Sequence, residues 1–139
     1  VELGEFSLHQ VQELACLHHL DWQEQQISQL MQMIGGHPYL VRLAMYEVSI
    51  GNTTLQQLLQ EASTEAGIFS HHLRRHLETL KQAPELAQMF KQVVLSVEPV
   101  ELNSMQIYQL HSMGLVKQLD NHVMPRCTLY REYFCRVLR

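Results

Sequence analysis

The stretch IGGHPYL at residues 34–40 predicts that one helix stops and another starts almost at once. Glycine is favoured just past a helix end and proline in the first turn of the next helix. The two glycines permit positive φ and let another backbone or a ligand come close, while Pro38 lacks an N–H that a first turn leaves unbonded anyway. The spacing alone fits an ordinary helix–helix corner, and the alternative is a corner that holds a flat ligand against a helix N-terminus.

Apolar residues at helical spacing surround this corner on both sides. The predicted helices span about 7–19, 21–34, 38–50, 54–59, 65–82, 85–95 and 102–113, and the last begins near 128. Proline or glycine separates several of them, and Pro99 is the best boundary between two subdomains. The sequence therefore predicts a mainly α fold.

The last forty residues have a different character. Two short apolar runs flank Asp120 and Asn121, a two-residue turn that predicts a β-hairpin at about 115–126. A helix before the hairpin and an aromatic helix after it give a winged-helix-like order. We expect a helical subdomain at 1–98 and a winged-helix subdomain at 99–139, which the helix at 84–96 can join.

Composition narrows the functional classes. The chain has 139 residues, 46% hydrophobic content and a net charge of −4, which fits a globular protein and does not suggest a nucleic acid or an acidic membrane as partner. Residues 100–139 alone are mildly basic, with five Lys and Arg against three Asp and Glu. Three cysteines without CxxC spacing and no long apolar run predict a cytoplasmic protein with reduced thiols and no membrane span. The first residue is valine, so we expect a piece of a longer protein.

Four segments carry a resemblance to a known family: GGHPYLV at 35–41, TEAGIF at 64–69 followed by HLR at 72–74, LHSMGLV at 110–116, and PRCTLYR at 125–131. They resemble the C-terminal part of the cyanobacterial AAA-like domain proteins. These are STAND-like P-loop NTPases, related in plan to archaeal ATPases. The resemblance covers nearly the full chain.

The resemblance implies a division of labour between a core and its attachments. In such proteins a RecA-like core binds ATP and Mg²⁺ and is followed by a helical lid and a winged helix, and this chain resembles the lid and winged helix alone. The sequence has no Gly-x-x-x-x-Gly-Lys-Ser/Thr loop. We therefore expect no catalytic residues, no enzyme activity and no cofactor in this piece, although ATP and Mg²⁺ are implied for the full-length protein.

The resemblance also implies site residues. The lid corner lies over the nucleotide base in related NTPases, which assigns a base contact to Gly36, His37 and Pro38 once the core is present. Some relatives place an arginine against the phosphates. Arg42 is the nearest candidate here, although it lies about one turn beyond the expected position.

Our leading hypothesis is a regulatory, non-catalytic part of an ATP-binding signalling NTPase. It would relay the nucleotide state to a partner, with its own NTPase core and an effector as partners and oligomers allowed. The alternative is a winged-helix DNA-binding module. The predicted recognition helix at 102–113 has no Lys or Arg, which disfavours DNA. Lys117 and Arg126 are candidate DNA or partner contacts, and Tyr133 is a third if it is the exposed aromatic residue of the closing helix.

Two further groups of residues resemble reactive or metal sites. His72 and His76 have the i, i+4 spacing of a metal pair, but zinc needs two more ligands, so we expect a solvated polar face and no metal site. Cys16 is predicted to pack on the apolar side of its helix. A Cys–His nucleophile has no supporting motif.

Overall fold

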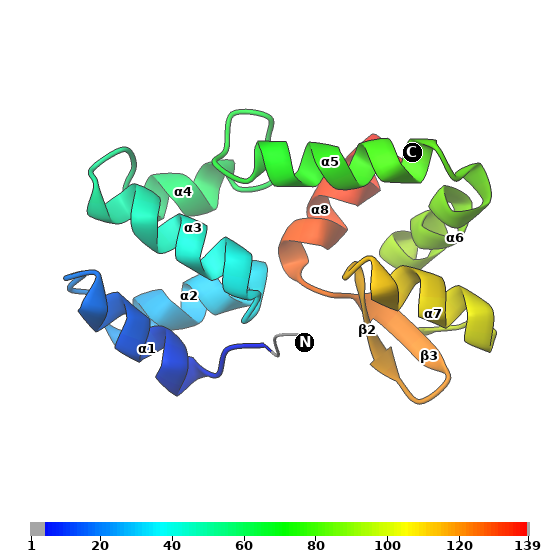
Figure 1. Ribbon diagram of the computed structural model, residues 1–139, viewed down its shortest axis with the longest axis horizontal. Coiled ribbons are helices and arrows are strands. Elements are labelled where there is room, and N and C mark those ends of the chain that lie inside the picture. The colour runs from blue at the N-terminus through cyan, green and yellow to red at the C-terminus, as the bar shows by residue number, and fades with distance from the viewer. Residues whose placement is uncertain (1–4, 139) are drawn as a thin grey trace. The chain divides into compact units, whose positions relative to one another are not determined.

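The computed structural model describes residues 5–138, and the chain divides into two compact units after Ser70. Helices α1 to α4 belong to the first unit, and the second unit contains α5 to α8 with a small sheet (Figure 1). The described residues form eight helices and a three-stranded antiparallel sheet. The prediction of a mainly helical fold with a small β part is confirmed.

The first unit is built only of helices around an aliphatic core. Its helices are α1 (Leu8–Leu17), α2 (Glu24–Ile34), α3 (Pro38–Ser49) and α4 (Leu55–Glu61). Both α1 and α4 pack against α2 and α3. The fully buried side chains include Val11, Leu30, Ile34, Leu40, Val41, Ala44, Met45 and Phe69. The apolar stripes read from the sequence therefore meet in one core, as amphipathic helices require.

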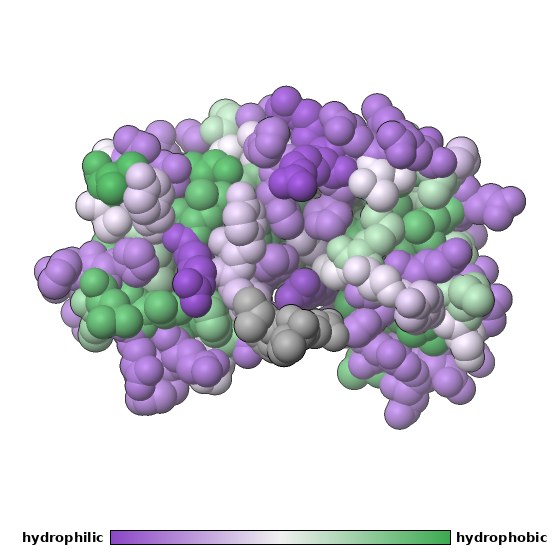
Figure 2. All heavy atoms as spheres, in the orientation of Figure 1, coloured by the Kyte–Doolittle hydropathy of each residue, from purple (hydrophilic) through white to green (hydrophobic). Residues whose placement is uncertain are grey.

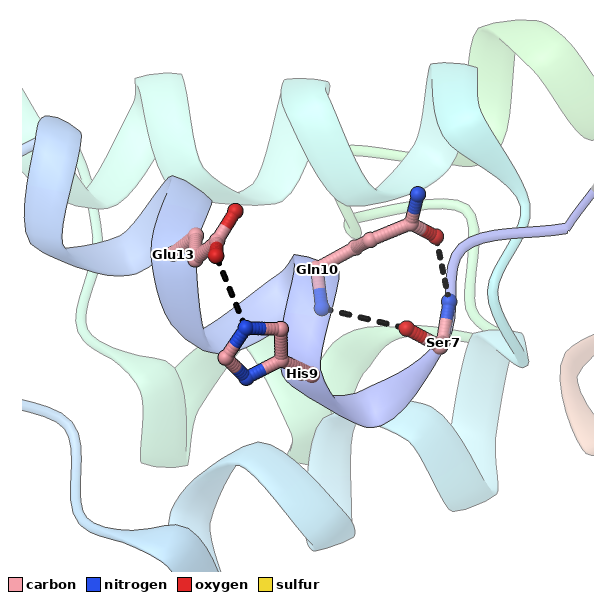
Figure 3. Close-up of polar contacts among 4 residues, drawn as sticks. All are labelled: Ser7, His9, Gln10 and Glu13. Carbon is pink, nitrogen blue, oxygen red and sulfur yellow. Dashed lines mark hydrogen bonds and ion pairs between the residues drawn. The ribbon is translucent and has the colours of Figure 1, made fainter.

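Helix α1 begins with a capping box at Ser7. The Ser7 hydroxyl accepts from the backbone N–H of Gln10 at 3.2 Å, and the Gln10 side chain accepts from the backbone N–H of Ser7 at 2.8 Å (Figure 3). Two N–H groups that the first turn leaves unbonded are satisfied in this way. One turn on, His9 and Glu13 pair at 2.8 Å with both side chains exposed, so the pair adds little stability.

The helix predicted at 65–82 begins later than expected. Residues 62–69 form turns, and α5 spans Ser70–Lys81. Gly67 explains the delay, because a Cβ there would overlap the carbonyl oxygen of Glu61. The hydroxyl of Thr64 donates to the same carbonyl at 2.8 Å, and the Gly67 amide bonds the Thr64 carbonyl at 3.3 Å. A tight turn therefore occupies residues that the apolar pattern alone assigned to a helix.

The second unit combines four helices with the sheet. Its further elements are α6 (Pro84–Leu95), β1 (Val100–Glu101), α7 (Ser104–Ser112), β2 (Val116–Leu119), β3 (His122–Pro125) and α8 (Thr128–Val137). The strand order is β1-β3-β2, with Val100 opposite Val123 and Leu119 opposite His122. The predicted hairpin is present, with Asp120 in the left-handed region at φ 56°. Strand β1 is too short to show a period in the sequence.

Helix α8 carries the aromatic core of the second unit. Tyr130, Tyr133 and Phe134 are fully buried, as is Phe90 of α6. The Phe134 ring meets those of Phe90 and Tyr133 edge to face, with centroids 5.1 Å apart in each case. Edge-to-face contacts of this kind stabilise beyond simple burial.

Candidate functional site

The glycine–proline corner has the predicted backbone geometry. Helix α2 ends at Ile34, and Gly35 adopts φ 62° while its amide bonds the carbonyl of Met31 at 2.8 Å. His37 is the N-cap of α3, and Pro38 is the first residue of that helix. The positive φ explains the first glycine of the pair.

The second glycine of the pair, Gly36, is required because the backbone of Phe6 lies directly against it. The amide of Phe6 donates to the carbonyl of Gly36 at 2.8 Å. A Cβ on Gly36 would overlap the Phe6 carbonyl oxygen and come within 2.7 Å of its nitrogen. The close approach that a glycine allows is therefore made here by the segment leading into α1.

The predicted corner residues differ in exposure. Gly36 and Pro38 are buried, and His37 is half-buried. Arg42 is exposed one turn along α3, and its guanidinium lies 5.7 Å from the centroid of the Phe6 ring. Phe6 thus contacts both Gly36 and Arg42. No periodic pattern in the sequence indicates this connection, because Phe6 precedes the first helix.

The described residues do not by themselves fit Mg²⁺ and ATP. Magnesium prefers carboxylate oxygens and phosphates, and no three His, Cys, Asp or Glu side chains converge within residues 5–138. Backbone N–H groups at a helix start can hold phosphate. At the start of α3, however, Pro38 has no N–H and the Gly36 side of the corner is covered by Phe6.

The basic residues near the hairpin divide into one exposed and two half-buried side chains. Lys117 on β2 is exposed. Arg126 is half-buried and donates to the carbonyl of Gly114 at 3.4 Å. Arg131 donates to the carbonyls of Val94 and Ser96 at 3.2 and 2.7 Å, which satisfies the end of α6. The hairpin region therefore has fewer guanidinium N–H groups available to a partner than its sequence suggests.

The expectation of an exposed Tyr133 is wrong. Its side chain is fully buried, because α8 buries two adjacent rows of side chains and not one. The Arg136 guanidinium lies 5.3 Å from the Tyr133 ring centroid. Tyr133 is part of the core in this structure and does not lie on its surface.

His72 and His76 of α5 face the aromatic core and do not lie on a solvated polar face, whereas His71 of the same helix is exposed. His72 Nε2 lies 2.7 Å from the Tyr130 hydroxyl, and the His76 ring meets the rings of His72 and Tyr130 edge to face. Burial, with the positive charges of Arg75 and Arg126, lowers the pKa of His76 below its ordinary value of 6.5. His72 and Tyr130 both lie in the segments that carry the family resemblance, at 72–74 and 125–131. The sequence did not show that these two residues contact each other.

Cys16 does not pack as predicted, because its side chain is exposed on α1. Among residues 5–138, Cys127 is the buried cysteine and Cys135 is half-buried. None of the described helices is long and apolar enough to cross a membrane.

Comparison with known proteins gives one match. The family model described as "AAA-like domain" matches residues 1–136. The chain belongs to the AAA-like domain family. No curated protein and no solved structure matches it. The two units of this AAA-like chain are therefore interpreted from their own geometry.

Proposed function

We propose that this AAA-like chain is a non-catalytic regulatory part of an ATP-binding signalling NTPase, relaying the nucleotide state to a partner. Within that proposal residues 1–98 are the helical lid and residues 99–139 are the winged helix, as in STAND-like relatives. The observation that carries it is the family match over residues 1–136 of a chain without a phosphate-binding loop. A cytoplasmic location accompanies the proposal.

The build of the corner supports a relay better than a chemical step. The Phe6–Gly36 hydrogen bond ties the segment that leads into α1 to the corner between α2 and α3, so we expect these segments to move as one stiff piece. A stiff element transmits a displacement without absorbing it. His37 and Arg42 retain exposed surface next to this piece. They are the side chains that we assign to contact with a nucleotide-bound core, with Gly36 and Pro38 positioning them.

The rival function, DNA binding through the second unit, has weaker support. Phosphate contacts supply most of the affinity of DNA-binding proteins. Helix α7 has no Lys or Arg, while Arg126 and Arg131 donate to backbone carbonyls. Lys117 is the exposed cation of the hairpin strands. We therefore favour protein docking.

Hydrogen exchange with and without ATP and Mg²⁺ tests the proposal. In the full-length protein we expect ATP to raise the protection of amides at 34–42, and we expect no change in the 139-residue chain alone. His37→Ala should reduce the ATP effect in the full-length protein, and the matched change His9→Ala on exposed α1 should not. Tight ATP binding or hydrolysis by the 139 residues alone would overturn the proposal, as would an ATP-insensitive 34–42 segment in the full-length protein.

A duplex DNA titration separates the rival. We expect little change in fluorescence anisotropy at low salt with the 139-residue chain. Strong binding that falls with salt and is lost in Lys117→Ala would instead assign the second unit to DNA.

A further inference from the structure

We propose that copies of this chain bind one another head to tail, the exposed face of α3 in one copy docking into a groove beside the hairpin of the next. The contact needs neither nucleotide nor an NTPase core. It shares Arg42 with the core contact proposed above, but it is tested on the 139-residue chain without nucleotide, so its outcome is separate from that of the ATP experiment.

The first half of the contact is a stripe along α3, which we call the α3 stripe. It consists of Tyr39, Arg42, Tyr46 and Ile50 at the start, middle and end of the helix. The three apolar or aromatic side chains are 52%, 54% and 50% exposed, and Arg42 is exposed between them. Positions separated by three, four and four residues lie on one helix face. Tyr and Arg are the residue types that most often anchor protein interfaces.

The second half is a groove in the second unit, which we call the hairpin groove. Its lining consists of Glu98, Pro99, Leu119, Asp120 and His122. The adjacent Val97 is 94% exposed and Leu119 is 49% exposed. The groove thus offers apolar surface beside two carboxylates, which suits an apolar side chain next to an Arg.

The walls of the groove are held before any partner arrives. The Ser96 hydroxyl donates to the carbonyl of Glu98 at 2.7 Å and accepts from its amide at 3.2 Å. Arg131 fixes the same loop through the Ser96 carbonyl. On the other side, the Gln118 side chain donates to the carbonyl of Asp120 at 3.0 Å. A loop that is ordered and yet presents a nearly fully exposed valine loses little entropy on binding.

The distribution of charge along the chain favours a second copy of the chain as the partner that fills the hairpin groove. Residues 1–70 carry one basic residue, Arg42, and eight Asp and Glu, while residues 71–139 carry nine Lys and Arg and six Asp and Glu. The net charges are −7 and +3, so contact between unlike units of two copies is more favourable than contact between like units, although two whole chains of net charge −4 repel at long range. Locally the signs are reversed, because Arg42 meets Glu98 and Asp120. Docking of the stripe on the groove is therefore the pairing that both the unit charges and the local charges favour.

The size of the contact predicts weak association. A contact between one helix face and one shallow groove buries an area at the lower end of the range for protein interfaces. We therefore expect a dissociation constant on the order of 100 μM. The contact joins different surfaces, so it leaves one copy of each pair with a spare groove and the other with a spare stripe. Such heterologous contacts extend beyond dimers unless they close into a ring.

Sedimentation velocity from 10 μM to 1 mM at low salt tests the contact through complementation. We expect the average mass of the wild type to rise past that of a dimer. Arg42→Glu and the double variant Glu98→Lys/Asp120→Lys should each associate at least 10-fold more weakly. A 1:1 mixture of the two variants should associate again and rise past a dimer, because an intact stripe meets an intact groove in one contact and the two reversed sets of charges attract each other in the other contact.

Matched controls keep the result specific. Lys81→Glu and Glu78→Lys/Glu132→Lys make the same charge changes at exposed positions outside both surfaces, and both should associate like the wild type. Circular dichroism checks that every variant is folded. A monomeric wild type at 1 mM, an Arg42→Glu variant that associates normally, or a mixture that stays monomeric would each overturn the proposal.

Discussion

The two units reach a defined fold by different means. In the first unit the specific contacts are between backbones: Phe6 against Gly36, and Glu61 against Gly67. In the second unit they are between rings, where Phe90, Tyr130 and Phe134 meet edge to face. The aliphatic core of the first unit could pack in several ways, so missing side chains at two glycines fix the path of the chain. The second unit is fixed by the shapes of large side chains.

The units also differ in how they use positive charge. Arg42 is the single basic residue of residues 1–70, and it lies exposed over an aromatic ring. In the second unit Arg126 and Arg131 donate to backbone carbonyls instead. Figure 2 shows hydrophobic residues in separate patches among hydrophilic ones on the face in view. A basic residue near the hairpin is thus not by itself a sign of a binding surface, whereas the one basic residue of the first unit is available for contact.

The largest expected effect is in the aromatic core. Phe134→Ala removes a fully buried ring that contacts three others. We expect the second unit to lose about 3–5 kcal/mol. The loss of stability is measured by urea denaturation, with hydrogen exchange of the amides at 71–138 as the readout. Phe134→Leu should lose much less, and the exposed Tyr108→Ala should stay within about 0.5 kcal/mol of the wild type.

The matching change in the first unit adds one methyl group. Gly36→Ala places a Cβ against the backbone of Phe6, which cannot rotate away as a side chain can. We expect a loss of about 1–3 kcal/mol. Fluorescence of Trp22, the single tryptophan of the chain, reports this unit.

Gly51→Ala separates crowding from backbone strain. Gly51 has φ +84°, and no atom lies within 4 Å of a Cβ added there. We therefore expect Gly51→Ala to lower the free energy of unfolding by about 1 kcal/mol through backbone strain alone. An equal or larger loss at Gly51 than at Gly36 would contradict the view that close backbone approach defines the first unit.

The contrast also explains what the sequence could predict. Helical spacing placed α1, α3, α6 and α7 well, and the Asp120–Asn121 turn located the hairpin, because periodicity and turn residues are local signals. The Phe6–Gly36 bond and the His72–Tyr130 contact join residues 30 and 58 positions apart, and no local pattern encodes them. Tyr133 was misjudged for the same reason, because helical spacing along the closing helix does not show which other elements cover it. For the corner, the sequence predicted its shape but not that Phe6 covers it.

A further expected effect is at the end of α6. Arg131→Met keeps much of the side chain's apolar length but removes donors to the carbonyls of Val94 and Ser96. We expect a loss of about 1–3 kcal/mol, since hydrogen bonds from a charged group exceed neutral ones. Hydrogen exchange should rise most for the backbone amides at 94–100. Lys91→Met on α6 is the control, because it removes a positive charge without removing these hydrogen bonds. An equal loss of stability in Lys91→Met would show that the charge matters and the hydrogen bonds do not.

The smallest expected effect depends on pH and belongs to the second unit alone. The pKa of His76 is lowered in the folded chain, so as the pH falls through 6.5 the unfolded chain takes up the proton first. The stability of the second unit should therefore be full above pH 6.5 and should fall as the pH drops toward the lowered pKa. Denaturation at pH 7.5 and 5.5 measures the difference, and His76→Gln, which has no titrating proton, should show a smaller one. Trp22 fluorescence should report little of this change, because the burial and the two arginines that lower the pKa belong to the second unit. A pH dependence of equal size in both units would mean that His76 is not its source.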